Sequence, residues 1–131
     1  VLVVPVGAMA GVGVEVARRL ADQEIGATVI DPRWVKPVPA EVVELAGRHR
    51  LVVTIEDNGV VGGVGAAVAG ELRAAGLDVP VRTIGIPQRF LDHGTRAQLL
   101  EKTGLTAQQI GHQVIGWMAA SEPFEVQQPA E

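Results

Sequence analysis

Four short runs of β-branched and other apolar residues alternate along this chain with segments of helical period. The runs cover residues 1–6, 27–31, 51–55 and 79–86. Runs that are apolar on both faces are typical of strands covered on both sides in a parallel sheet. We therefore expect a three-layer α/β/α fold with a mainly parallel sheet of about four strands, joined by right-handed crossovers.

The segments between the runs predict the helices. Residues 7–23 begin with a glycine-rich turn that leads into a helix, and residues 39–48 predict a short second helix. A third helix opens at the glycines of 62–65 and ends at Gly76. The last helix starts at Thr106, where a Thr-x-x-Gln capping box satisfies amide groups that have no partner within the helix.

The chain has 131 residues, a length that fits one domain. We predict a single domain over residues 1–119 and a disordered tail over 120–131, because the tail lacks periodicity. The abrupt apolar start at Val1 favours a fragment of a longer protein. The sequence contains no Cys, which excludes a disulfide, a Cys-ligated metal and a thiol nucleophile.

Charge, aromatic content and the length of the apolar stretches argue against nucleic-acid and membrane partners. The net charge is −4, aromatic residues make up 3% of the chain, and Tyr is absent. Nucleic-acid binders are expected to present basic surfaces and stacking aromatics, so we expect no nucleic-acid partner. The longest apolar stretch, residues 1–14, is shorter than the roughly 20 residues that span a bilayer, so we expect no membrane partner.

Glycines at the start of the third helix form a candidate anion-binding turn. A helix start presents free backbone amides, which favour a phosphate or carboxylate. The cluster lacks both the dinucleotide fingerprint and the P-loop lysine. Tight turns and close helix–sheet packing are therefore the favoured interpretation, and an anion site at Gly62, Gly63 and Gly65 stays open as the alternative.

Acidic and amide side chains follow the third strand at Glu56, Asp57 and Asn58. Sites in open α/β sheets form beyond the carboxyl ends of strands, so an acid–base pair or a metal ligand is conceivable here. We favour a structural role instead. In that interpretation Asp57 and Asn58 shape a turn, and Glu56 pairs with a nearby basic residue.

Two loops combine charges with a large apolar side chain, as docking surfaces do. The loop after the second strand carries Asp31, Arg33, Trp34 and Lys36, although Trp34 could instead close the domain's own core. The loop 86–94 carries Arg89, Phe90 and His93. We find no nucleophile–base–acid set and no metal-ligand spacing among the three His. The sequence therefore predicts no catalytic, cofactor-binding or metal-binding residue in this chain.

Four segments in this order resemble the C-terminal domain of the 1-deoxy-D-xylulose-5-phosphate synthase family. They are VGAMAGVGVEVA (6–17), ATVIDPRWVKPV (27–38), HRLVVTIEDNGVVGGVGAAVA (49–69) and GIPQRFLDHGTRAQLLEKTGLTAQQI (85–110). The wider relatives are the transketolase C-terminal domains. The resemblance implies a transketolase C-terminal domain-like fold, which in this family includes a further antiparallel strand just before Val1.

The resemblance also implies an activity for the whole enzyme. Members condense pyruvate with glyceraldehyde 3-phosphate and release CO₂, in the cytoplasm of bacteria, for isoprenoid, thiamine and pyridoxal synthesis. Thiamine diphosphate and Mg²⁺ lie on the two preceding domains. The last domain is non-catalytic, packs on the upstream catalytic domains and contributes to a homodimer, so this fragment alone is expected to be inactive.

Interface residues are accordingly the candidate functional residues of this chain. Two other functions stay open: a C-terminal domain of a pyruvate dehydrogenase β-subunit or transketolase relative, and a free-standing anion-binding α/β module. The predicted interface set is Asp31, Arg33, Trp34, Lys36, Glu56, Asp57, Asn58, Arg89, Phe90 and His93.

Overall fold

The computed structural model describes residues 1–121 and contains one sheet of four parallel strands. The strands are β1 (Leu2–Pro5), β2 (Thr28–Val29), β3 (Val52–Gly59) and β4 (Val81–Ile86). Their order across the sheet is β2-β1-β3-β4, so β1 and β3 are central and β2 and β4 are the edges. The predicted parallel sheet is confirmed.

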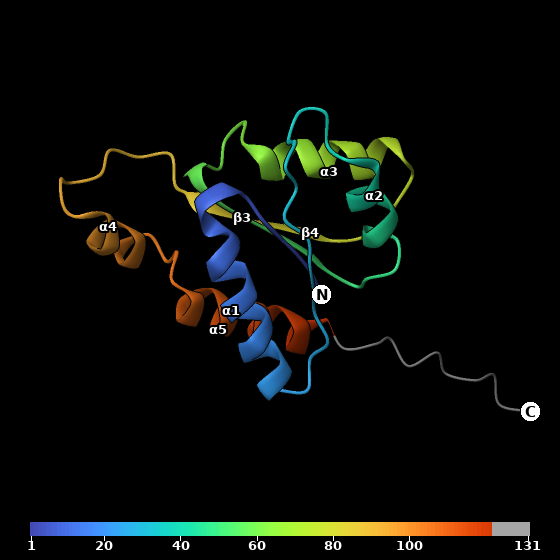
Figure 1. Ribbon diagram of the computed structural model, residues 1–131, viewed down its shortest axis with the longest axis horizontal. Helices are drawn as coiled ribbons and strands as arrows, with labels where there is room; N and C mark the ends of the chain where they lie inside the picture. Colours follow the sequence, from blue (N-terminus) through green and yellow to red (C-terminus); the bar gives the residue numbers. More distant parts are fainter. Residues whose placement is uncertain (122–131) are drawn as a thin grey trace, which may run out of the picture.

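Helices cover both faces of this sheet, which gives the expected three layers (Figure 1). One face packs against α1 (Ala10–Asp22) and α5 (Ala107–Ala120). The other packs against α2 (Ala40–Ala46) and α3 (Val64–Ala74). Successive strand residues point to opposite faces, so each strand contributes to both cores. The α1/α5 core contains Val3, Val53 and Ile55, and the α2/α3 core contains Leu2, Val4 and Val52.

Local signals explain where the helices lie. The Thr106 hydroxyl accepts the Gln109 amide, and the Gln109 side chain returns to the Thr106 amide, as the capping box predicted. In α1, Gly13 packs directly on the ring of Pro5, and a Cβ there would lie 2.5 Å from the Pro5 Cγ. The glycine therefore lets α1 approach the sheet closely.

Several elements differ from their predicted bounds. The strand β3 continues through the predicted turn to Gly59. Its pairing with β4 is interrupted by an irregularity after Ile55 and resumes where Gly59 pairs with Ile86. A short 3₁₀ turn, η1 (Gly7–Met9), precedes α1, and β2 is only two residues long.

The C-terminal third adds one helix that was not predicted, α4 (Arg96–Lys102). The last helix, α5, extends through Ala120, and Ser121 follows it. The rest of the tail predicted to be disordered, from residue 122 on, lies outside the described residues. Among residues 1–121, none of the helices combines the length and the hydropathy that a bilayer span requires.

Candidate functional site

The Glu56 carboxylate caps the start of α3. Its side chain is 1% exposed. One oxygen accepts the Val64 backbone N–H at 3.0 Å, and the other accepts the Gly65 N–H at 2.8 Å. The N-cap residue of α3 is Gly63, which has no side chain to fill this role. An anion at a helix start satisfies free amides and complements the helix dipole, so Glu56 ties β3 to α3.

Glycines make room for the Glu56 side chain. A Cβ on Gly63 would strike the Glu56 Oε1, and a Cβ on Gly85 would lie 3.1 Å from its Cγ. The next glycine, Gly65, lies against β3 and β4, where a Cβ would come within 2.5 Å of the Thr54 Oγ1. That hydroxyl is buried and has no hydrogen-bond partner within residues 1–121. Small residues thus surround the carboxylate on the helix side and the sheet side.

These contacts change two interpretations made from the sequence. The partners of Glu56 are backbone amides, so its expected pairing with a basic residue is wrong. Its burial also removes Glu56 from any exposed docking surface. At the candidate anion-binding turn, Gly62 has a φ of +69°, Gly63 allows a close approach, and the Gly65 amide binds Glu56. The protein's own carboxylate therefore occupies the place predicted for an external anion.

Asp57 and Asn58 lie in the last part of β3 rather than in a turn. The Asp57 Oδ2 accepts a hydrogen bond from the Arg96 guanidinium at 2.7 Å, which links the end of β3 to the start of α4. Asn58 is exposed. Neighbouring residues at the end of one strand therefore hold two different helices: Glu56 holds α3, and Asp57 holds α4.

The loop after β2 is exposed and close to α3. Trp34 is 73% exposed, which excludes the alternative that it closes the core of the described domain. Asp31, Arg33 and Lys36 are exposed with it. Between this loop and α3 lies a hollow of about 590 Å³, lined by Val35, Lys36, Asn58, Val61 and Glu71 among others.

The segment between β4 and α4 projects from the body of the domain (Figure 1). It carries Arg89, Phe90 and His93, all of them exposed, with Phe90 fully so. The helix α4 that follows has no buried residue. Val61, which was not among the predicted interface residues, is 67% exposed in the turn before α3. Its position as an apolar residue between turn-forming glycines was the available signal.

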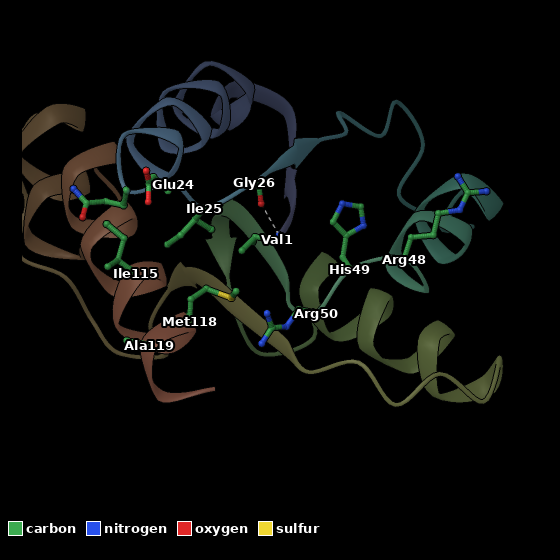
Figure 2. A pocket seen from close by; sticks show the side chains of 11 residues that line it. Val1, Glu24, Ile25, Gly26, Arg48, His49, Arg50, Ile115, Met118 and Ala119 are labelled. Carbon is green, nitrogen blue, oxygen red and sulfur yellow. Dashed lines mark hydrogen bonds between the residues drawn. The ribbon is translucent and has the colours of Figure 1, made fainter. Parts of the chain in front are cut away.

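A second hollow, of about 490 Å³, lies at the amino ends of the strands (Figure 2). Its walls include Val1, Ile25 and Met118, with His49 beyond them near the end of α2. The Val1 backbone nitrogen donates a hydrogen bond to the Gly26 carbonyl at 2.8 Å, which ties the start of β1 to the segment before β2.

His49 has a structural role in this hollow. Its Nδ1 lies 2.6 Å from the Leu45 carbonyl oxygen, which can only accept, and its Nε2 lies 2.8 Å from the Thr28 hydroxyl. The ring therefore joins the end of α2 to β2. Both ring nitrogens of His49 are thus engaged in hydrogen bonds within the domain.

Thiamine diphosphate and Mg²⁺ do not fit the described residues. No three His, Asp or Glu side chains within 1–121 converge as metal ligands. The amides of Val64 and Gly65, which could receive a diphosphate at a helix start, are bound to Glu56. Since Mg²⁺ bound with a diphosphate can use only one or two carboxylates, the occupied amides at the start of α3 are the main reason that the cofactor does not fit there.

Comparison with known proteins decides the family. The profile of the family described as "Transketolase, C-terminal domain" matches residues 1–110. The chain belongs to this family. This transketolase C-terminal domain is 60% identical over 121 residues to 1-deoxy-D-xylulose-5-phosphate synthase of Clavibacter sepedonicus, and 58% identical over 120 residues to that of Mycobacterium avium (strain 104). Each match covers 92% of this chain and 19% of the relative.

Among solved structures, the domain is similar to a protein titled "Split gene transketolase, inactive beta4 tetramer". The TM-score is 0.80 and the sequence identity 34%, over 90% of this chain and 39% of the other. The resemblance inferred from the sequence motifs is therefore confirmed at the level of family and fold. The chain spans about a fifth of the length of the curated relatives that it matches, 19% in the two cases above.

Proposed function

We propose that this chain is the C-terminal domain of a 1-deoxy-D-xylulose-5-phosphate synthase and that it acts by docking rather than by catalysis. The observation that carries the proposal is the 60% identity to such a synthase over 92% of the chain. The whole enzyme, a cytoplasmic bacterial transferase, joins pyruvate to glyceraldehyde 3-phosphate and releases CO₂. Thiamine diphosphate supplies the chemistry, and other domains of the enzyme bind it with Mg²⁺.

The proposed docking surface consists of the loop after β2, the end of β3 and the projecting segment before α4. Trp34 and Phe90 support this assignment, because large apolar side chains that are exposed in one domain are typical anchors in an interface. Its partners are the upstream domains of the same enzyme and the second subunit of a homodimer. The surface comprises Asp31, Arg33, Trp34, Lys36, Asp57, Asn58, Arg89, Phe90 and His93.

Two substitutions in the full-length synthase test the docking role. Trp34→Ala and Phe90→Ala each remove an exposed anchor and should weaken domain packing or the dimer by about 2 kcal/mol or more, the usual size of an interface hot spot. The dimer dissociation constant then rises at least about thirtyfold. Val14→Ala is the matched control, since Val14 is a half-exposed apolar residue on α1, away from these loops.

Analytical ultracentrifugation measures the dimer, and calorimetry measures thermal stability. Unchanged dissociation and melting in both anchor variants would remove the docking proposal while leaving the enzyme class untouched. Titration of this chain with thiamine diphosphate and Mg²⁺ tests the other half of the proposal. Saturable heat of binding would contradict the assignment of the cofactor to other domains.

The two alternatives have tests of their own. A domain of a pyruvate dehydrogenase β-subunit should co-sediment with the core of that multienzyme complex. A free-standing anion-binding module should show movement of the Gly62, Gly63 and Gly65 amide signals when phosphate is added. We expect no movement, because Glu56 already binds at this helix start.

A further inference from the structure

The edge strand β4 has an unpaired side. It pairs with β3 on one side and is the last strand in the sheet order. The Val52 amide donates to the Pro80 carbonyl, so even-numbered residues here direct their backbone groups toward β3. The backbone groups alternate along a strand, which leaves those of Val81, Thr83 and Gly85 directed outward.

No described residue covers this outward row with a strand. Thr83, at its centre, is exposed. The opposite edge, β2, pairs over only two residues, so it offers a much shorter template. An edge of six residues with free amides and carbonyls is a surface on which another strand can pair.

We propose that β4 pairs antiparallel with β4 of a second copy, around a two-fold axis at Thr83. The two sheets then form one continuous sheet, in which Val81 faces the partner's Gly85 and Thr83 faces the partner's Thr83. In this register each residue with outward backbone groups lies opposite a partner residue whose backbone groups also point outward. Every outward amide can therefore donate a hydrogen bond to a carbonyl of the partner strand. This inference goes beyond the proposed enzyme activity and does not depend on it.

Charge and proline select this register over its neighbours. Moving the two-fold axis one residue back to Arg82 would set two guanidinium groups directly opposite each other, which is destabilising. Moving it one residue forward to Ile84 would place Val81 opposite the partner's Pro87, which has no amide to donate. With the axis at Thr83, Arg82 faces the partner's Ile84. Arg82 also lies over the Trp117 ring, 5.3 Å from its centroid, which holds its charge above the domain's own face.

A single introduced cysteine tests the register directly, because the chain contains no native Cys. In Thr83→Cys the two equivalent Cα atoms lie about 5.5 Å apart across the axis, within the range of a disulfide. In the control Val81→Cys they lie about 14 Å apart, beyond that range. Under mild oxidation we expect a disulfide-linked dimer from Thr83→Cys, formed at least tenfold faster than from Val81→Cys.

The other outcomes of this experiment overturn the proposal. Equal cross-linking rates at positions 81 and 83 would show that the register is wrong. A chain that stays monomeric at millimolar concentration, with no dimer from Thr83→Cys, would show that β4 does not pair with itself.

A proline provides the second measurement. Thr83→Pro removes an amide that is not used within the sheet, so the monomer should keep its fold, as shown by an unchanged circular dichroism spectrum. The dimer should dissociate at least tenfold more readily in sedimentation experiments. Thr83→Val is the matched control, since it keeps the outward amide and a β-branched side chain. Equal dimerisation of the two variants contradicts pairing through this edge.

Discussion

Removing the Glu56 carboxylate should destabilise the domain far more than removing an exposed carboxylate. In Glu56→Ala, the Gly65 and Val64 amides lose their acceptors, of which the Gly65 amide is the more buried. A buried amide without a partner costs about 1–3 kcal/mol. The lost charge at the helix start costs about 1 kcal/mol more. We expect the free energy of unfolding to fall by about 2–4 kcal/mol.

Urea unfolding followed by circular dichroism measures this loss, with the slope against urea expected to stay constant. Glu56→Gln keeps one oxygen for an amide and removes the charge, so its loss should be smaller, about 1–2 kcal/mol. Glu71→Ala is the matched control, because Glu71 is an exposed carboxylate on the same helix. Its effect should stay within about 0.5 kcal/mol.

Phosphate separates a lost cap from a general loss of packing. In Glu56→Ala the start of α3 regains free amides, so phosphate at ten times its dissociation constant should restore about 1.4 kcal/mol. Chloride at equal ionic strength should not. A loss below about 1 kcal/mol in Glu56→Ala, or equal losses in the alanine and glutamine variants, would refute the reasoning from charge and amide capping.

Three further predictions concern local contacts, each measured by urea unfolding. Gly13→Ala should lower the free energy of unfolding by about 1–3 kcal/mol, because its Cβ meets the Pro5 ring in β1. Gly11→Ala, where the space is open, should raise it by about 0.5–1 kcal/mol. Changes of the same sign in the two variants would contradict this reasoning. His49→Ala should lower the free energy of unfolding by about 1–3 kcal/mol. Thr28→Val should lower it less, since the histidine also bonds the Leu45 carbonyl. An unchanged stability in His49→Ala would refute the role of this ring in joining α2 to β2. Arg96→Ala should lower the free energy of unfolding by at most about 1 kcal/mol, because its ion pair with Asp57 is exposed. In 1 M salt the variant and the unaltered protein should be equally stable. A loss of stability that does not depend on salt would exclude an ionic origin.

The sheet could be predicted from the sequence because its signals are local. A run of apolar β-branched residues specifies a strand buried on both faces without reference to distant residues. The same holds for the last helix, whose capping box at Thr106 lies within four residues. The helix α4 has an equivalent box at Thr95 and Gln98. It was missed because α4 buries no residue, so no apolar period accompanied the cap.

The role of Glu56 could not be predicted, because it depends on contacts between elements. The sequence Asp57-Asn58-Gly59 is rich in turn-forming residues, which predicted the end of the strand. Pairing of Gly59 with Ile86 of β4 overrides that preference and keeps the segment in the sheet. Only then does the Glu56 side chain lie on the α3 face, against amides eight and nine residues later.

The contact between Glu56 and Gly63 has a consequence for how the two positions can vary. A Cβ at position 63 would collide with the Glu56 carboxylate and also with the Gly59 backbone carbonyl oxygen, 2.5 Å away. Glu56→Ala removes the first collision and leaves the second, so Gly63→Ala should be less harmful beside Glu56→Ala than beside Glu56, and unfavourable in both. The two substitutions together should therefore cost less than the sum of their separate effects.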